Sequence, residues 1–481
     1  MKKYSFLNRT HIKFGFILLF TLSSSLFIPQ NCEAQYTDLY NFTSAGGQTP
    51  YGNVTLIGNT LYGMTCYGGG YGYGNIFSVH TDGTGFRDLF DFNGTNGANP
   101  SGSLTLLGGK FYGMTYGGGV HTWGAIFSID TNGTGFQDLF SFYISNYAEG
   151  GTPYGSLTLA GKKFYGMARA GGNGGYGVLF SFDTNGTNYK LVYNFGGPNG
   201  SHPHGDVICN NGVLYGMTEE GGAHQDGIVF SVDTDGTNFK DLLDFNDTNG
   251  QIPYGDLILI RNKLYGMTLQ GGASLIYGLI FSINTDGTGY KDMLDFTNAN
   301  GAAPNGSLVL SGNLLYGTAS EGLYGVIFTI DTSGNNYTII HHFNDTLGEY
   351  PENSLTQSGS IFYGTALGGG TFDHGIIFKF DTNNISTSIN KIAGASGSVD
   401  VYPNPSNGIF TVALSHAELV SASQTTVVIY DVLGEKVYSQ FLIRNSQFVI
   451  DLSNQPSGIY LYRVSKNDGT LLGEGKLVIQ K

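Results

Sequence analysis

Short apolar runs separated by turn residues recur along most of the chain, at intervals of about 50 residues. The copy that covers residues 253–296 holds four such runs, at 257–259, 263–267, 278–283 and 292–296. Aliphatic, β-branched and aromatic residues fill the runs, and Gly, Asn and Asp occupy the gaps, which is typical of strands joined by tight turns. No run shows a helical period, and the many glycines disfavour helix. Each copy therefore predicts a four-stranded antiparallel sheet.

A Tyr-Gly pair inside the second run marks seven copies of this unit. Their spacings are 50, 53, 50, 50, 51 and 47 residues, for tyrosines at Tyr62, Tyr112, Tyr165, Tyr215, Tyr265, Tyr316 and Tyr363. Four strands in about 50 residues fit one blade of a propeller of the kelch size class. A residue type present in every copy serves packing, so we expect the Tyr-Gly pair and the third-strand Phe to be core.

The two ends of the array favour a closed ring over an open solenoid. The last copy begins at Pro351 and supplies only three strands, while residues 38–42 form an unpaired fourth strand similar to residues 88–92. Pairing that strand with the last copy removes exposed strand edges. The sequence thus predicts an all-β fold with a seven-bladed β-propeller over residues 35–383, closed by the N-terminal strand.

The first 34 residues are typical of a secretory signal peptide. Lys2, Lys3, Arg9 and Lys13 precede an apolar stretch from residue 14 to 28, and Ala34 suits cleavage. After this point no segment approaches 18 consecutive apolar residues, so the mature chain is expected to lack a membrane span.

Composition narrows the classes of partner and chemistry. Charged residues make up 12% of the chain, the net charge is −14, and no basic stripe is present, which disfavours nucleic acid. No phosphate loop, nucleophile elbow or zinc signature appears, so we expect no cofactor and no metal. Cys66 and Cys209 lie in nonadjacent copies and predict free thiols.

The repeat ends before a polar, small-residue stretch at residues 384–398, whose composition predicts a flexible linker. Residues 399–481 carry five further strand-like runs, at 409–412, 426–430, 448–450, 459–464 and 476–479. Short strands with turn signals between them predict a small immunoglobulin-like β-sandwich.

Motifs in this tail resemble a known family, the C-terminal sorting domain (type A) of the type IX secretion system. The positions that carry the resemblance are Tyr402, Pro403, Asn404, Pro405, Gly408, Asp431, Gly434, Gly458, Tyr460 and Lys476. The resemblance implies contact with the type IX secretion machinery and export across the outer membrane to the cell surface or the extracellular space. The alternative is an ordinary immunoglobulin-like accessory module.

The repeats are similar to the GloVer-type tandem repeats of bacterial surface proteins, through the pattern YGMT…GG…G-x-IFS-x-DT-x-G. This resemblance implies no established activity. Thr318 and Thr365 replace the methionine of the pattern in copies six and seven, where we expect a different core contact.

Strand order predicts that two sets of loops share one end of the ring and make that end rich in aromatic residues. One set follows the proline that opens each copy, and the other precedes the third strand. Their candidate ligand-binding residues are Tyr51, Tyr73, Trp123, Tyr154, Tyr176, His204, Asp226, Tyr254, Tyr277, Tyr324 and His374. Aromatic rings flanked by polar groups suit a sugar. The alternative is that these rings fill space between blades.

The fourth copy concentrates titratable residues on the same end, with His202, His204, Glu219, Glu220, His224 and Asp226. Such a cluster could bind a metal or hold an acid–base pair, or it could be a set of solvated loop residues. The Asp-Thr-Asp-Gly stretches resemble calcium loops, but hairpin turns explain them better. We assign no catalytic residue and expect a non-catalytic binding module for a glycan or protein. The alternatives are a polysaccharide lyase or glycosidase with its site in the fourth blade, and a purely structural or adhesive surface protein.

Overall fold

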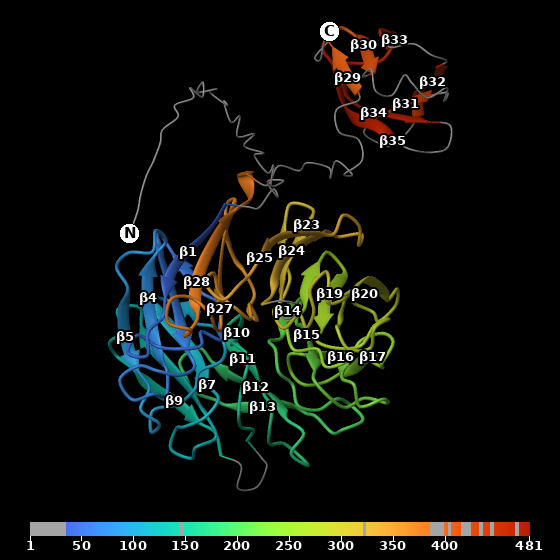
Figure 1. The fold of residues 1–481 in the computed structure, drawn as a ribbon. Helices are drawn as coiled ribbons and strands as arrows, with labels where there is room; N and C mark the ends of the chain where they lie inside the picture. The colour runs from blue at the N-terminus through green and yellow to red at the C-terminus, as the bar shows by residue number, and fades with distance from the viewer. Residues whose placement is uncertain are drawn as a thin grey trace, which may run out of the picture. The chain divides into compact units, whose positions relative to one another are not determined.

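The computed structural model describes residues 35–143, 149–320, 324–384, 399–402, 406–414, 425–431, 436–442, 447–466 and 471–481 (Figure 1). The expected signal peptide and residues 385–398 of the expected linker lie outside these ranges. The chain divides into two compact units, Met1–Ile385 and Ser386–Lys481, and each is described by itself. In the described part of the chain, no helix is long and apolar enough to span a membrane.

The described residues of the first unit form seven four-stranded antiparallel sheets. The first strands of the sheets are β2 (Thr55–Ile57), β6 (Thr105–Leu107), β10 (Thr158–Ala160), β14 (Ile208–Asn210), β18 (Ile258–Ile260), β22 (Val309–Ser311) and β26 (Thr356–Ser358). The second strands are β3 (Thr60–Thr65), β7 (Lys110–Thr115), β11 (Lys163–Ala168), β15 (Val213–Thr218), β19 (Lys263–Thr268), β23 (Leu314–Ala319) and β27 (Ile361–Ala366). The third strands are β4 (Asn75–His80), β8 (Ala125–Asp130), β12 (Val178–Asp183), β16 (Ile228–Asp233), β20 (Leu279–Asn284), β24 (Val326–Asp331) and β28 (Ile376–Asp381). The fourth strands are β1 (Gln35–Asn41), β5 (Arg87–Asp91), β9 (Gln137–Ser141), β13 (Lys190–Asn194), β17 (Lys240–Asp244), β21 (Lys291–Asp295) and β25 (Thr338–His342).

One of these sheets joins the two ends of the repeat array. Its strand order is β1-β28-β27-β26, so the N-terminal strand supplies the fourth strand that the last repeat lacks. β1 runs antiparallel to β28, with Asp38 opposite Phe378. The predicted pairing of the N-terminal strand is therefore confirmed. A single 3₁₀ turn, η1 (Thr382–Asn384), follows β28.

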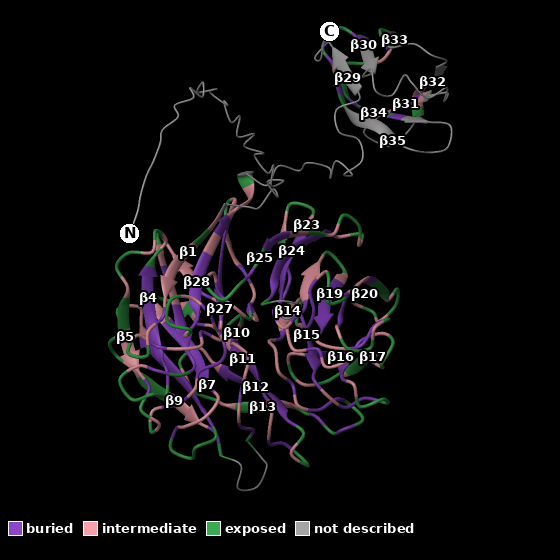
Figure 2. Cartoon of the chain, in the orientation of Figure 1, coloured by how far each residue is buried: buried purple, intermediate pink, exposed green. Residues whose placement is uncertain are grey.

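The hydrophobic core of this unit lies between neighbouring sheets. Seven clusters of buried side chains each combine residues from two successive repeats, and one of them joins the seventh repeat to the first. The third-strand phenylalanine is fully buried in every repeat, as predicted, at Phe77, Phe127, Phe180, Phe230, Phe281, Phe328 and Phe378. Figure 2 shows the contrast, since β4 is buried except at its last residue whereas β5 is exposed or half-buried.

Hydrogen bonds also link each sheet to the next. The Thr55 hydroxyl donates to the Leu104 carbonyl of the following repeat at 2.7 Å, and Thr105 repeats this contact with Leu157 at 2.7 Å. The Thr356 hydroxyl makes the equivalent bond back to the Val54 carbonyl at 2.5 Å. The contacts thus run from the seventh repeat to the first, which agrees with the joined ends.

Stacked rings connect the fourth strands of successive repeats near the outside. Tyr40 stacks on Phe86 with centroids 4.1 Å apart, and Phe140 stacks on Tyr189 at 3.9 Å. At the junction with β1, His341 takes the equivalent place and stacks on Tyr36 at 3.8 Å. This contact places a titratable ring, buried to 2% exposure, beside the strand that joins the two ends.

The second unit contains a three-stranded and a four-stranded sheet around one core. Their strands are β29 (Val399–Tyr402), β30 (Ile409–Leu414), β31 (Thr425–Asp431), β32 (Lys436–Leu442), β33 (Gln447–Asp451), β34 (Gly458–Lys466) and β35 (Leu471–Ile479). The sheet orders are β29-β30-β33 and β32-β31-β34-β35, and Phe410, Ile429 and Leu477 are buried between them.

Candidate functional site: a central cavity

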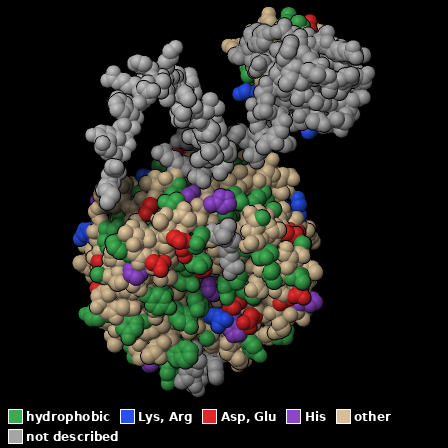
Figure 3. All heavy atoms as spheres, viewed as in Figure 1, with side chains coloured by type: hydrophobic (Ala, Val, Ile, Leu, Met, Phe, Trp, Pro, Cys, Tyr) green, Lys and Arg blue, Asp and Glu red, His purple; other side chains and the backbone are tan. Residues whose placement is uncertain are grey.

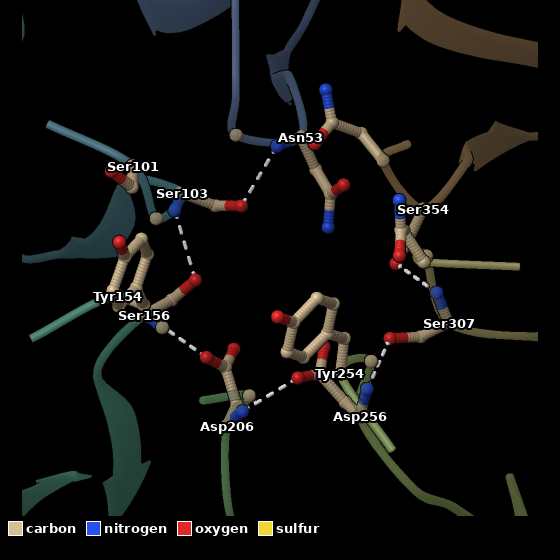
Figure 4. A pocket seen from close by; sticks show the side chains of 18 of the residues that line it. Asn53, Ser101, Ser103, Tyr154, Ser156, Asp206, Tyr254, Asp256, Ser307 and Ser354 are labelled. Atoms are coloured by element: carbon tan, nitrogen blue, oxygen red, sulfur yellow. Dashed lines mark hydrogen bonds between the residues drawn. The ribbon is translucent and has the colours of Figure 1, made fainter. Parts of the chain in front are cut away.

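A cavity of about 220 Å³ is lined by the same three consecutive positions of all seven repeats. We call it the central cavity. Its lining residues end one residue short of the first strand of each sheet, so the sheets meet around it (Figure 4). The first positions are Tyr51, Ser101, Tyr154, His204, Tyr254, Asn305 and Glu352; the second are Gly52, Gly102, Gly155, Gly205, Gly255, Gly306 and Asn353; the third are Asn53, Ser103, Ser156, Asp206, Asp256, Ser307 and Ser354.

The second position is glycine in six repeats because the backbone of the next repeat passes very close to it. A Cβ atom on Gly102 would lie 2.2 Å from the Gly155 carbonyl oxygen, which no side chain tolerates. The seventh repeat has Asn353 at this position, and its Nδ2 donates to the Pro50 carbonyl and to Thr365 Oγ1, both at 2.6 Å. The expected change of core contact at Thr365 is therefore a hydrogen bond with Asn353 in the same repeat, and the Thr365 hydroxyl also donates to the Gly52 carbonyl across the joined ends at 3.4 Å.

The third position forms a belt of hydrogen bonds around the cavity, which we call the polar belt. In six of the seven steps, the backbone N–H of one member donates to the side-chain oxygen of the equivalent residue in the next repeat. These steps are Asn53 to Ser103, Ser103 to Ser156, Ser156 to Asp206, Asp206 to Asp256, Asp256 to Ser307 and Ser307 to Ser354. Figure 4 shows the belt as a chain of dashed lines, with the Asn53 amide directed into the open centre.

Two successive members of the polar belt are carboxylic acids. The Asp206 backbone N–H donates to Asp256 Oδ1 at 2.6 Å, and Asp206 Oδ1 accepts from the Ser156 backbone N–H. Burial raises the pKa of both carboxyl groups, and the charge of Asp256 raises the pKa of Asp206 further. This pair therefore holds protons more strongly than exposed aspartates do.

Three stacked rings form one side of the lining. His204 lies between Tyr154 and Tyr254, with ring centroids 4.4 and 4.3 Å apart and interplanar angles of 24° and 26°. Burial lowers the pKa of His204 to about 4, so the imidazole is neutral at pH 7. Burial and then the charge of Glu219 raise the pKa of Tyr254 to about 12, so its hydroxyl stays protonated. The stack is thus an uncharged group of rings next to the polar belt, in which His204 covers one face of each tyrosine and Tyr116 lies 4.7 Å from Tyr154.

The titratable cluster of the fourth repeat is largely paired within the protein. Arg169 Nε donates to Glu219 Oε2 at 2.9 Å, and the Tyr254 hydroxyl donates to Glu219 Oε1 at 3.2 Å. His202 Nδ1 lies 2.9 Å from Glu220 Oε2. Among the residues that the structure describes, no three or more His, Cys, Asp or Glu side chains are arranged to hold a metal ion. Ion pairing of Glu219 and Glu220 is thus the better description of this cluster.

The structure separates the candidate binding residues into two groups. Tyr51, Tyr154, His204 and Tyr254 line the central cavity. The other seven do not line it and lie in the loops before the third strands: Tyr73, Trp123, Tyr176, Asp226, Tyr277, Tyr324 and His374. The two sets of loops do meet, because the Thr152 N–H donates to the Trp123 carbonyl at 2.8 Å and the equivalent bond recurs in the other repeats. Figure 3 shows hydrophobic side chains on one face of this unit, with few Lys or Arg between them.

The polar belt is the part of the site that reasoning from sequence missed. A signal for it exists, because a Gly followed by Ser, Asp or Asn comes two residues after the opening proline in six of the seven repeats. A Gly followed by Ser, Asp or Asn is also typical of a turn, and a turn alone does not indicate a binding site. Only the register of the sheets brings these side chains together around one cavity.

The hairpin turns between the third and fourth strands use their acidic groups internally. Asp286 Oδ1 accepts from the Thr288 backbone N–H at 2.9 Å and from the Thr288 hydroxyl at 2.6 Å. Asn132 accepts the same two bonds from Thr134 in the second repeat. Because an amide oxygen serves equally well, these stretches act as turns. Cys66 and Cys209 are both free thiols, as predicted.

The sorting-motif residues that the structure describes lie in the strands of the second unit, except Gly408, which directly precedes β30. Gly408 has a φ of 111°, and a Cβ there would lie 2.8 Å from Ser453 Cα, so glycine is required. Tyr460 is buried in β34, which begins at Gly458, and its hydroxyl donates to the Pro456 carbonyl at 2.9 Å. Tyr402 ends β29, Asp431 ends β31 and Lys476 lies in β35, while Pro403, Asn404, Pro405 and Gly434 lie outside the described residues.

The first unit is thus an all-β tandem-repeat protein of propeller-like sheets, and comparison with known families agrees. The Gloeobacter/Verrucomicrobia repeat matches residues 21–208 and 164–378, which is more than half of the chain. The chain belongs to this repeat family. A secretion system C-terminal sorting domain matches residues 400–480, so the chain is exported through the type IX system to the cell surface or the extracellular space.

The solved structures that match this chain show low sequence identity and TM-scores below 0.5. The BT4673 extracellular domain from B. thetaiotaomicron is 13% identical, with a TM-score of 0.48, over 92% of this chain and 58% of its own length. The Niastella koreensis GH74 enzyme is 12% identical, with a TM-score of 0.49, over 92% and 67%. An oligogalacturonate lyase in complex with manganese is 12% identical, with a TM-score of 0.47, over 72% and 93%. At this similarity none of their activities transfers to this chain. No curated protein matches the sequence.

Proposed function

We propose that this chain is an exported binding module whose closed seven-bladed β-propeller holds a carbohydrate in its central cavity and catalyses no reaction. An immunoglobulin-like sorting sandwich follows the propeller and delivers it. The observation that carries the proposal is the central cavity itself, where the Tyr154–His204–Tyr254 stack lies next to the polar belt.

This combination of surfaces suits a sugar. An aromatic face covers the C–H groups of a pyranose ring, while hydroxyl and carboxyl groups form hydrogen bonds with the sugar hydroxyls. The tyrosine rings supply the first surface, and Ser103, Ser156 and Ser307 of the polar belt supply groups of the second kind. A volume of about 220 Å³ lies below the roughly 300 Å³ at which pockets for drug-sized ligands begin. The cavity therefore suits one terminal sugar unit and not a long chain.

The partners and positions of the carboxyl groups favour binding over hydrolysis. A glycosidase needs two carboxyl groups that flank the scissile bond. Glu219 and Glu220 are held by Arg169 and His202, and Asp206 and Asp256 are neighbours within one belt rather than opposed across the cavity. The binding experiment below also distinguishes this proposal from its alternatives, which are a lyase, a glycosidase or a purely structural protein.

A glycan array probed with the full mature chain tests the proposal. We expect defined glycans to bind, and Tyr154→Ala and Tyr254→Ala each to reduce that signal at least tenfold through loss of a stacking face. Trp123→Ala is the matched control, because Trp123 is an aromatic side chain with 41% exposure that lies outside the cavity. Signal lost in the Trp123 variant but kept in the two tyrosine variants would place the site on the outer loops. No glycan binding would end the proposal, and glycan cleavage abolished by His204→Ala would favour the enzyme alternative.

A further inference from the structure

We infer that a hydroxyl group of the bound sugar completes the polar belt between Ser354 and Asn53, and that the Asn53 amide orients the ligand. This inference rests on the carbohydrate function proposed above and names the contact that fixes the sugar in the central cavity. The observations that carry it are the one step missing from the belt, the free Asn53 amide and the serine hydroxyls that fill most other steps.

The polar belt is interrupted where the seventh repeat meets the first. In the pattern of the other six steps, the Ser354 backbone N–H would donate to the side chain of Asn53, but no bond joins these two residues (Figure 4). Both still take part in the rest of the belt, since Ser354 Oγ accepts from the Ser307 N–H at 2.7 Å and the Asn53 N–H donates to Ser103 Oγ at 2.9 Å. The belt is therefore open only between its two ends, and we call this interruption the open step.

The side chain of Asn53 differs from those of the other belt members. Each of the others accepts a backbone N–H bond from the preceding repeat. Neither Oδ1 nor Nδ2 of Asn53 has a hydrogen-bond partner among the described residues, and the amide is directed into the open centre of the cavity (Figure 4). A half-buried amide without a partner loses hydration and gains nothing in return. A group that enters the cavity would supply the partner that the protein lacks.

The junction of the first and seventh repeats does not depend on the open step. Asn353 Nδ2 donates to the Pro50 carbonyl at 2.6 Å, and the Thr356 hydroxyl donates to the Val54 carbonyl at 2.5 Å. These bonds hold the two repeats together without any contribution from the side chain of Asn53. The open step is therefore available to a ligand.

The chemistry of the filled steps indicates which group fits the open one. Four of the six filled steps use a serine hydroxyl as the acceptor, at Ser103, Ser156, Ser307 and Ser354. A sugar hydroxyl has the same chemistry, because it accepts an N–H bond and donates one O–H bond. At the open step it accepts from the Ser354 N–H and donates to Asn53 Oδ1, while Asn53 Nδ2 donates to a neighbouring sugar oxygen. These contacts involve no charged group, so they suit a neutral sugar with a free hydroxyl beside a second oxygen.

Asn53→Ser tests the inference, because serine at this position should accept the Ser354 N–H and complete the belt without a ligand. On the array of defined glycans, the full mature chain with this substitution should lose at least tenfold of the signal that the unaltered chain gives. Its melting temperature without glycan should equal or exceed that of the unaltered chain. Asn53→Ala should lose the signal as well, without any gain in melting temperature. Asn132→Ala is the matched control, since this asparagine lies in a hairpin turn outside the cavity and should leave the signal unchanged.

The outcomes separate this inference from the proposed function. Full signal from Asn53→Ser, on glycans whose binding Tyr154→Ala and Tyr254→Ala reduce, would overturn the inference and leave the carbohydrate function standing. A reduced signal with a lower melting temperature in both Asn53 variants would also overturn it, because Asn53 would then support the fold and not contact the ligand. No glycan binding by the unaltered chain would overturn the proposed function and the inference with it.

Discussion

The third strand and the first cavity position of each repeat behave in opposite ways. The third strand carries the same fully buried phenylalanine in all seven repeats. The first cavity position carries three tyrosines and one each of serine, histidine, asparagine and glutamate. Both positions recur seven times in equivalent backbone surroundings, so the fold alone would favour one residue type at each. The uniform position serves packing, and the varied position is where the repeats are free to differ for a ligand.

The largest expected effect on the free energy of unfolding comes from substituting the third-strand phenylalanine. Phe230→Ala removes a side chain of 0% exposure that packs between Phe195 and Phe239, and should lower the free energy of unfolding by about 3–5 kcal/mol. Tyr154→Ala, at the varied position, should lower it by clearly less because Tyr154 is only half-buried. Urea unfolding of both variants would measure the difference. A Tyr154 variant as unstable as the Phe230 variant would contradict the contrast.

The stacked pair at the joined ends should make stability depend on pH. His341 has no hydrogen-bond partner on either ring nitrogen among the described residues, and burial, then His342, lowers its pKa to about 4 from 6.5. The unfolded chain therefore binds a proton first, and stability should fall as pH drops from 6.5 to 4, by about 3 kcal/mol. His341→Phe, which copies Phe90 and Phe140, should abolish that loss. Unfolding curves at several pH values would reveal it, and parallel pH profiles for the two proteins would contradict it.

Neutralising Asp206 should stabilise the fold at pH 7. The folded pKa of Asp206 lies above its ordinary value of 3.8, because of burial and then Asp256, so the folded state loses stability as pH rises above 3.8. Asp206→Asn should therefore raise the free energy of unfolding at pH 7 by on the order of 1–2 kcal/mol, with the gain vanishing in acid. Thermal melting at pH 7 and below pH 3.8 would measure it. A variant less stable than the parent at pH 7 would show that the carboxylate supports the fold.

The smallest effect concerns backbone strain beside the opening proline. Ile252 has a φ of 55°, in the left-handed region that β-branched residues disfavour, and Asn99 holds the equivalent position with the same φ of 55°. Ile252→Asn should raise the free energy of unfolding by about 1 kcal/mol, as asparagine tolerates this conformation. The midpoint of chemical unfolding measures this gain, and a lower midpoint would mean that Ile252 packing outweighs the strain.

Much of the architecture follows from the sequence because the repeat presents the same pattern seven times. In the fifth repeat, the expected strands 257–259 and 292–296 are displaced by one residue from β18 and β21. The N-terminal strand was also identifiable, since residues 38–42 match the fourth strand of other repeats. In the second unit β29 and β32 were missed. Val399–Tyr402 runs into the Tyr-Pro motif and Lys436–Leu442 follows a turn motif, and neither segment was among the five strand-like runs.

Only some of the residues that line the central cavity could be predicted from the sequence. The opening proline of each repeat identified Tyr51, Tyr154, His204 and Tyr254, because residues next to a turn at one end of the ring face that end. Tyr73 and Trp123 belong to the same end but lie in the loops before the third strands and do not line the cavity. That distinction depends on which loop lies nearer the meeting point of the sheets, and a linear pattern does not contain it. The buried environment of His341 likewise depends on β1 packing against a distant repeat.

The most direct measurement is a crystal structure of the mature chain soaked with a glycan that the array identifies. We predict electron density for a terminal sugar unit in the central cavity, against the Tyr154–His204–Tyr254 stack and within hydrogen-bond distance of the polar belt. Density confined to the outer loops around Tyr73 and Trp123, with the central cavity empty, would contradict the proposed binding site.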